Sequence, residues 1–247
     1  MENNNSNDFP NYDNLPVIQS QNIIPSLQTI ANAFSNDSVP DKITAINILR
    51  SIHKNFHSFF IDSIGGLKSI FINSCLNCKT SIKLQQVSLL FITELFKDDF
   101  DDDTENFIYW FYDPVLNLIK NNILKNLVEN AINTMSKEMP YNATIVVLIR
   151  SLKRDDEYIN KFVFGCLKTV FISNKGKIHF CFDFNEIFRQ LKIKELYEEK
   201  SLNDKYFNSI KMVFILMKSF LEVDEEEELV SKFSKKNKIL YEILTQN

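Results

Sequence analysis

Glycine and proline are scarce in this chain of 247 residues, which contains 4 glycines and 6 prolines. Half of the prolines, Pro10, Pro16 and Pro25, lie close to the N-terminus. These two residue types interrupt helices more strongly than any others. Their scarcity after Pro25 therefore permits long helices over most of the chain.

The usual signals for membranes, secretion and nucleic acids are also missing. No run of about 18 consecutive apolar residues occurs, so no transmembrane helix is expected. The N-terminal MENNNSND lacks the basic start and apolar core of a signal peptide. The net charge is -4, whereas nucleic-acid-binding domains are typically basic. We expect a cytoplasmic protein that binds neither nucleic acid nor membrane, with Cys75, Cys78, Cys166 and Cys181 reduced.

Catalytic motifs are absent, since the sequence contains no GxSxG, no phosphate-binding glycine loop and no HExxH. The acidic run Asp98–Glu105 lacks the glycine and glutamate positions of an EF-hand, so we interpret it as a solvated loop. His53, His57, Cys75 and Cys78 have spacings that suit tetrahedral zinc. The surrounding loops lack glycine-containing knuckles, and cysteine is a common core residue. We predict a non-enzyme without metal or cofactor, and keep a zinc-dependent protein as an alternative.

Apolar residues with helical spacing are abundant. Ser81–Phe96 shows the clearest pattern, with a broad apolar stripe that follows the 3.6-residue period. Similar units recur along the chain, each with a polar or basic loop before an apolar helix. The expected helices are Pro25–Phe34, Asp41–Ile52, Phe59–Asn77, Ser81–Lys97, Asp103–Asn121, Leu124–Lys137, Tyr141–Leu152, Asp156–Phe171, Phe184–Tyr197, Asp204–Leu221 and Glu225–Leu244.

Such a series predicts an all-α fold, an α-solenoid of about five to six HEAT-like helix pairs, because each pair can bury its apolar face only against its neighbours. We expect residues 25–247 to form one domain and residues 1–24 to form a disordered, Asn-rich tail. Asp41 is a candidate helix cap. Pro114 is expected to kink its helix or to begin a new one. The strand-like segment Ile178–Phe184 is interpreted as an irregular connection.

Five segments in order combine a polar or basic loop with an apolar helix. The segments are SNDSVPDKITAINILRSI (Ser35–Ile52), CKTSIKLQQVSLLFITELF (Cys78–Phe96), NNILKNLVENAINTM (Asn121–Met135), RDDEYINKFVFGCLKTVF (Arg154–Phe171) and LNDKYFNSIKMVFILMKSF (Leu202–Phe220). In this order they resemble the helical repeats of a TOG domain of the CLASP and crescerin kind. The resemblance covers about Pro25–Leu244 and is degenerate, since it includes no invariant signature.

The resemblance implies a flat array of helix pairs that binds tubulin through the loops along one edge. By position, the basic residues that would meet tubulin's acidic surface are Lys79, Lys83, Lys125, Arg154 or Lys161, and Lys205. The family's tryptophan anchor falls at Val39, next to Pro40. Loss of an aromatic anchor typically costs about 2–4 kcal/mol of binding energy. The only tryptophan, Trp110, is expected to pack within its own helix.

Two functions follow from these patterns. The first is a non-catalytic TOG-like protein that binds tubulin or the microtubule lattice in the cytoskeleton, with the cilium as one candidate location. The alternative is a HEAT or armadillo scaffold adaptor that binds another protein and does not contact tubulin. In both cases the turns within successive pairs should line up on one rim. The basic residues should therefore form one ridge, with Asp98–Glu105 on the opposite rim.

Overall fold

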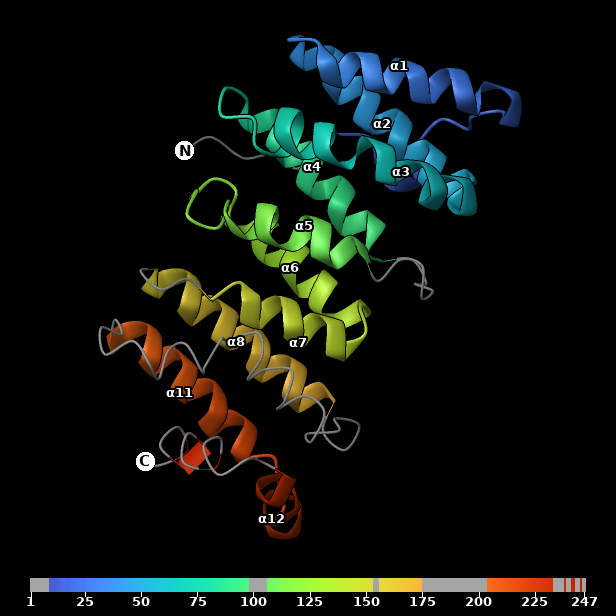
Figure 1. Ribbon diagram of the computed structural model, residues 1–247. Helices are drawn as coiled ribbons and strands as arrows, with labels where there is room; N and C mark the ends of the chain where they lie inside the picture. Colours follow the sequence, from blue (N-terminus) through green and yellow to red (C-terminus); the bar gives the residue numbers. More distant parts are fainter. Residues whose placement is uncertain are drawn as a thin grey trace. The chain divides into compact units, whose positions relative to one another are not determined.

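A computed structural model describes residues 9–97, 106–152, 156–174 and 204–232, with positions 238, 241, 242 and 245 (Figure 1). Within these ranges every regular element is a helix and no strand occurs, so the predicted all-α class is confirmed. The contacts divide the chain into two compact units, Met1–Glu138 and Met139–Asn247. The single domain expected from residue 25 onward stays a prediction.

Among its described residues, the first unit contains six α-helices and one π-helical turn. After the short 3-10 turns η1 (Tyr12–Asn14) and η2 (Ser20–Asn22), the elements are α1 (Ile23–Ser35), α2 (Val39–Asn55), α3 (His57–Phe71), the π turn η3 (Ile72–Leu76), α4 (Ile82–Leu95), α5 (Asn106–Leu116) and α6 (Lys125–Glu138). Within each pair, α1 contacts α2, η3 contacts α4, and α5 contacts α6. One row is formed by α2, α4 and α6, and a second row by α1, α3 with η3, and α5.

Side-chain caps fix where several helices begin. Ser38 caps α2 by accepting a hydrogen bond from the Asp41 amide, and Ser81 caps α4 in the same way from Leu84. The prediction that Asp41 is the cap was wrong, because Asp41 lies in the first turn, where the helix dipole favours its charge. Pro114 lies inside α5, which ends two residues later at Leu116 instead of continuing to Asn121.

The π turn η3 continues α3 and is closed by side chains from neighbouring helices. A π-helical bond runs from the Asn77 amide to the Ile72 carbonyl (2.9 Å). The Gln85 amide donates to the Leu76 carbonyl (3.0 Å), and Lys42 Nζ donates to the Ser74 carbonyl (3.3 Å). Carbonyl groups at this helix end therefore obtain partners from α4 and α2.

The continuous helix His57–Leu76 is long and apolar enough to cross a membrane by length and composition alone. Its apolar residues Phe60, Ile64, Leu67 and Phe71 are nevertheless buried in the first unit. The exposed positions form a small or polar stripe at helical spacing: Ser58, Asp62, Gly66, Ser69 and Asn73. This two-sided pattern is typical of a core helix in a packed helical array.

Phe71 is the centre of an aromatic cluster that joins four helices of the first unit. It is fully buried, and its ring centroid lies 5.8 Å from that of Phe34 in α1. Edge-to-face contacts at 5.6 Å and 6.1 Å link it to Phe91 in α4 and Phe111 in α5. These geometries suit the quadrupoles of aromatic rings. The abundance of phenylalanine in the sequence thus has a structural role in this core.

A buried ion pair links α2 to α4. Arg50 Nε and Nη2 each donate to a carboxylate oxygen of Glu94 at 2.6 Å. Arg50 Nη1 donates to the Asn47 side chain, and Nη2 also donates to the Pro10 carbonyl, both at 2.9 Å. Arg50 is fully buried, so its charge depends on this set of partners.

Residues 9–15 pack on α2, in a region where a disordered tail is expected. The Leu15 side chain is buried, and Lys54 Nζ donates to the carbonyl oxygens of Tyr12 and Asp13. A few apolar and aromatic anchors therefore hold a polar, proline-interrupted stretch in place. Residues 1–8 lie outside the described residues.

The second unit contains α7 (Tyr141–Arg150), α8 (Glu157–Ser173), α11 (Asp204–Lys218) and α12 (Val223–Lys232) among its described residues. Asp156 caps α8 through the Ile159 amide, and α8 packs against both α7 and α11. The expected helix Phe184–Tyr197 and the segment Ile178–Phe184 lie outside the described residues. So does most of the stretch after Lys232.

Candidate protein-binding rim

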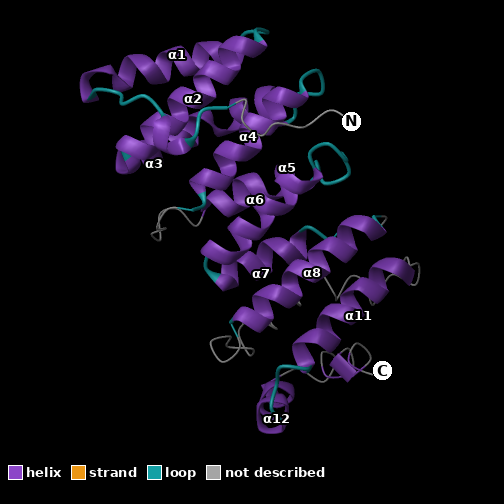
Figure 2. Cartoon of the chain, turned by 180° about the vertical axis from the view of Figure 1, so that it is seen from behind, coloured by secondary structure: helices purple, strands orange, loops and turns teal. Residues whose placement is uncertain are grey.

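The three turns within the helix pairs of the first unit lie on the same side of that unit. They are Asn36–Ser38, Asn77–Ser81 and Asn117–Leu124, and we call them, with the first turn of each following helix, the turn rim. Two opposite views agree on this arrangement (Figures 1 and 2). In the same views α4 ends and α5 begins on the other side. The predicted alignment of the turns is therefore present within the first unit.

Lys79 and Lys83 lie on the middle turn of this rim. Lys79 is exposed in the turn between η3 and α4, and Lys83 is exposed in the first turn of α4. The Lys83 ammonium also lies 5.6 Å from the centre of the Phe9 ring. This distance is within the range of a cation–π contact.

Lys125 is the first residue of α6, on the third turn of the rim. Its ammonium lies 3.9 Å from the Glu129 carboxylate, four residues along the helix, and both side chains are partly exposed. Lys120 is also exposed on this rim, in the turn that precedes α6. The sequence had predicted Lys120 inside the helix Asp103–Asn121. The run of asparagines at Asn117, Asn121 and Asn122 is the signal that could have identified this turn.

Val39 lies on the first turn of the rim but does not form a protruding anchor. It is the first residue of α2, and its side chain is half-buried beside the Ser38 cap. A binding surface centred here would have no large aromatic side chain at the position that the TOG resemblance assigns to tryptophan.

The remaining predicted basic residues belong to the second unit. Lys161 is exposed on α8. The backbone of Lys205 lies in the first turn of α11, and its side chain is outside the described set. Arg154 lies outside the described residues, as does the acidic run Asp98–Glu105. The structure thus brings Lys79, Lys83 and Lys125 onto one rim, while a ridge that includes the other three stays a prediction.

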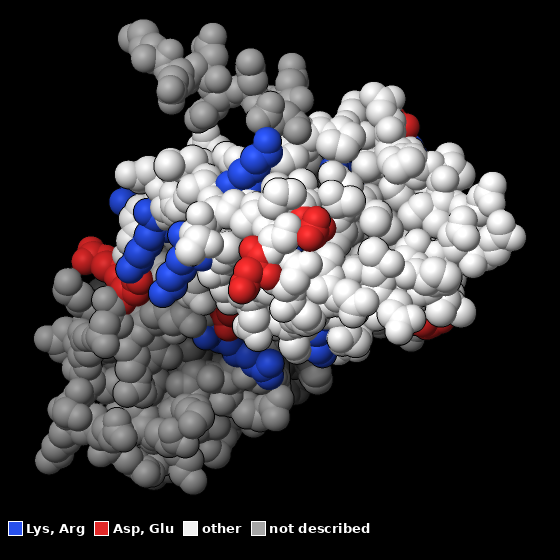
Figure 3. Space-filling model, turned by 90° about the horizontal axis from the view of Figure 1, so that it is seen from above, with Lys and Arg blue, Asp and Glu red and all other residues white. Residues whose placement is uncertain are grey.

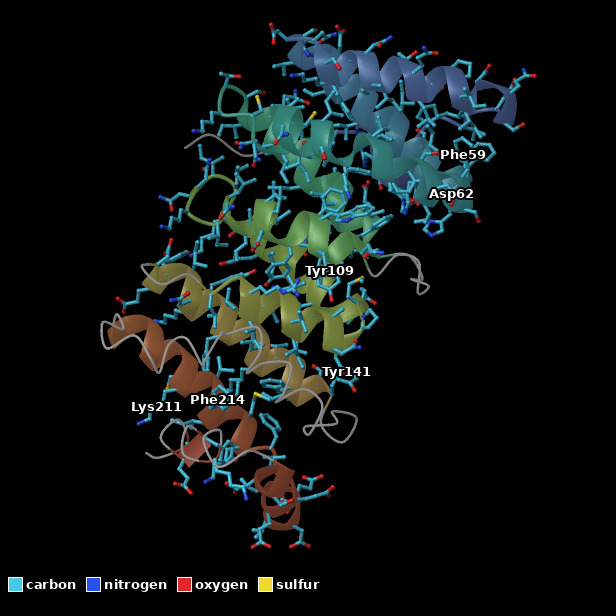
Figure 4. The ribbon with its side chains drawn as sticks, in the orientation of Figure 1. Phe59, Asp62, Tyr109, Tyr141, Lys211 and Phe214 are labelled. Carbon is cyan, nitrogen blue, oxygen red and sulfur yellow. The ribbon has the colours of Figure 1, made fainter. Side chains whose placement is uncertain are left out.

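Charge on the rim is mixed but lysine-rich. The turns and first helical turns contribute the lysines Lys79, Lys83, Lys120 and Lys125, alongside the acidic residues Asp37 and Asp41. The space-filling view shows both basic and acidic side chains on the face that it presents (Figure 3). At the other end of α3, Phe59 and the exposed Asp62 mark the opposite rim (Figure 4). The excess of lysine over acidic residues on the turn rim favours contact with an acidic partner.

The zinc-ligand candidates do not converge in the structure. Among the described residues no group of three or more His, Cys, Asp or Glu side chains could hold a metal ion. The rings of His53 and His57 pack edge to face at 5.1 Å, and His53 also packs against Phe60. Cys75 is buried in η3, whereas Cys78 lies in the following turn. Packing within the core accounts for the histidine pair.

The two thiols of the CxxC differ in acidity. Burial raises the pKa of Cys75 to about 11, against a weaker opposing effect from a hydrogen bond to Ser74. Burial also opposes ionisation of Cys78, but hydrogen bonds with Thr80 and Ser81 outweigh it and lower the pKa of that thiol. The Cys78 sulfur lies 3.3 Å from the Thr80 hydroxyl. Since the thiolate is the reactive form, Cys78 should be the more reactive of the two.

Alkylation by iodoacetamide at pH 8 is expected to modify Cys78 well before Cys75. At this pH Cys75 stays protonated, because its folded pKa lies above the solution pH, and it is also buried. Peptide mass spectrometry after short exposures would measure both sites separately, with the protein unfolded in urea as the control that equalises them. Equal or faster labelling of Cys75 in the folded protein would contradict the assignment.

A pocket lies in the second unit. Its lining includes the last residue of α11, residues of α12 and the described C-terminal positions: Lys218, Val223, Glu226, Glu227, Val230, Ser231, Lys238, Tyr241, Glu242 and Thr245. Lys218 Nζ lies 2.9 Å from Glu226 Oε1, and the Tyr241 hydroxyl donates to the same oxygen at 3.1 Å. Burial and the nearby Glu226 charge raise the pKa of Tyr241. We assign no reaction to this pocket.

Trp110 is held within the second row of the first unit. Its ring packs against Phe107 at 5.1 Å, and Lys68 Nζ lies 3.7 Å from the ring centre. Gly65 of α3 lies next to the Trp110 ring. A Cβ atom added at Gly65 would lie 3.7 Å from that ring. These contacts agree with the packing role expected for this residue.

The described geometry thus identifies a lysine-rich rim of mixed charge. A scan of the chain against protein-family models finds no match, and a search among curated proteins finds none that is similar to it.

Proposed function

We propose that this chain is a non-catalytic TOG-like protein whose helix pairs are HEAT-like repeats of an α-solenoid. In this proposal it binds tubulin or the microtubule lattice through the turn rim. The observation that carries the proposal is the placement of Lys79, Lys83 and Lys125 on one side of the first unit, at the turns that the resemblance assigns to tubulin contact. The partner's acidic surface would supply the complementary charge.

The strength of such binding would come from several weak contacts. An exposed lysine contributes about 1 kcal/mol or less to an ion pair, so single substitutions should have small effects. Together the lysines create a local positive potential that attracts an acidic surface and weakens as salt is added. Binding by this rim should therefore decrease steeply as the ionic strength rises.

Changing Lys79, Lys83 and Lys125 together to glutamate is expected to weaken binding to tubulin or microtubules at least about tenfold, because three attractive contacts become repulsive. The fold should be retained, since Lys83 and Lys125 lie in the first turns of helices, where glutamate is compatible with the dipole. Co-sedimentation with microtubules and gel filtration with free tubulin at low salt measure the effect.

The matched control is the triple variant Lys97→Glu, Lys137→Glu and Lys168→Glu. It changes the net charge equally at three exposed positions that do not belong to the turns and first helical turns of the turn rim. It should bind as the parent does. Equal loss in both triple variants would show that only net charge matters. A parent that binds neither free tubulin nor polymer at low salt would refute the proposal.

A scaffold adaptor without tubulin contact is the second candidate, and the half-buried Val39 favours it. Without an aromatic anchor on the first turn, the rim lacks the kind of side chain that most often dominates a protein interface. An adaptor would yield a stable partner in a pull-down that the Lys79, Lys83 and Lys125 substitutions leave unchanged. The same triple variant therefore separates the two functions.

A further inference from the structure

Residues 9–15, here called the strap, bind across α2 and the start of α4. The Phe9 ring lies beside Lys83, and the Pro10 carbonyl accepts a hydrogen bond from Arg50 Nη2 at 2.9 Å. The Tyr12 hydroxyl lies 2.9 Å from His53 Nδ1. The strap thus contacts side chains from two helices that are distant from it in sequence.

The strap has a defined local conformation of its own. Residues Tyr12–Asn14 form one 3-10 turn, which Asn11 caps through the Asp13 amide. The residues on either side of this turn, Asn11 and Leu15, are extended. The turn places Tyr12 against His53 and leaves Leu15 only 5% exposed. A short segment that forms its own capped turn loses less conformational entropy when it binds.

The receiving surface is made of Arg50, His53, Lys54 and Lys83, which we call the strap site. Lys54 Nζ donates to the carbonyl oxygens of Tyr12 and Asp13 at 2.9 and 2.8 Å. With the Arg50 bond to Pro10, three of these contacts are made to main-chain oxygens, which any peptide of this conformation can offer. Glu94 holds the Arg50 guanidinium by two further bonds, so this donor is preorganised independently of the strap.

We propose that the strap site is a peptide-binding site that the strap occupies in cis, and that a partner protein can occupy it in trans. The partner segment would have the chemistry of the strap: a proline followed by an asparagine-capped helical turn that carries a tyrosine and, three residues later, a leucine. Main-chain bonds to Arg50 and Lys54 supply general affinity, while the tyrosine and leucine supply selectivity.

The cis strap competes with any such partner. A segment tethered by a short linker has an effective concentration on the order of millimolar at its own site. A partner peptide of micromolar affinity therefore binds weakly while the strap is in place. Binding in trans becomes measurable once the side chains that anchor the strap are removed.

The test uses the full chain with Tyr12→Ala and Leu15→Ala, and a fluorescein-labelled peptide of sequence FPNYDNLPV, which corresponds to Phe9–Val17. Fluorescence anisotropy should show saturable binding to this variant, at least about tenfold tighter than to the parent chain. Adding Lys54→Ala to the variant should weaken peptide binding about tenfold, because two charge-assisted bonds are lost. A peptide of scrambled sequence is the control.

Several outcomes would overturn the proposal. These are absence of binding to the folded variant, equal binding to parent and variant, and indifference to Lys54→Ala. If the double variant fails to fold, Tyr12→Ala alone serves instead, and it should show intermediate peptide binding. Gel filtration of the parent is run in parallel. A dimer that dissociates when Tyr12 and Leu15 are replaced would assign the site to the strap of a second copy and overturn the partner assignment.

Discussion

Replacing Glu94 with alanine is expected to lower the free energy of unfolding by about 3–5 kcal/mol. The substitution leaves the fully buried Arg50 guanidinium without two of its charge-assisted hydrogen bonds, both of 2.6 Å. A buried charge without its partner keeps its full desolvation cost. Urea denaturation followed by circular dichroism, compared with the parent chain, measures the loss.

Two further variants separate the buried charge from other causes. Glu138→Ala removes an exposed carboxylate that pairs with Lys137, and it should change stability by about 0.5 kcal/mol or less. The double variant Arg50→Met with Glu94→Leu removes both charges and should be clearly more stable than Glu94→Ala. A cost below about 1 kcal/mol for Glu94→Ala would mean that water or other groups solvate Arg50.

Replacing Phe71 with alanine is expected to cost about 3–5 kcal/mol, because the cavity lies where four helices meet. The residue contacts Phe34, Phe91 and Phe111, and each aromatic contact contributes beyond simple area burial. Thermal or urea unfolding would show the first unit weakened.

The control for this cavity is Phe59→Ala, the same substitution on the same helix at a half-buried position near the opposite rim (Figure 4). It should lower the free energy of unfolding by less than half as much, because the half-buried Phe59 side chain contributes less buried apolar area than Phe71. Equal losses of stability at Phe59 and Phe71 would contradict the central role of the Phe71 aromatic cluster, because helix propensity favours alanine at both positions.

Local signals allowed most of the described helices to be predicted from the sequence. The apolar period of Ser81–Phe96 predicts α4 within about two residues, and the expected helix Asp156–Phe171 matches α8 to the same margin. Placement of Lys79 and Lys83 at one turn follows from the same signals. These features depend on residues close together in the chain, where spacing and capping determine the conformation.

Features that depend on distant residues could not be predicted in this way. Arg50 and Glu94 are 44 positions apart, and neither residue alone signals a buried pair. The strap contains a proline and two asparagines, residue types that are common in disordered segments, yet Tyr12 and Leu15 attach it to α2. Lys120 was missed because α5 ends early, after Pro114. Tertiary partners decide these cases, and a single sequence does not show which residues meet.

The π turn Ile72–Leu76 affects how relatives of this chain should be aligned. A helix that contains a π turn holds one residue more than a regular α-helix spanning the same distance. A related protein with an uninterrupted helix should therefore show a single-residue gap between positions 72 and 76. Without that gap, each residue of the turn that follows the helix would be shifted by one position in the alignment. The cysteine positions Cys75 and Cys78 and the lysines of the next turn would then be matched to the wrong residues.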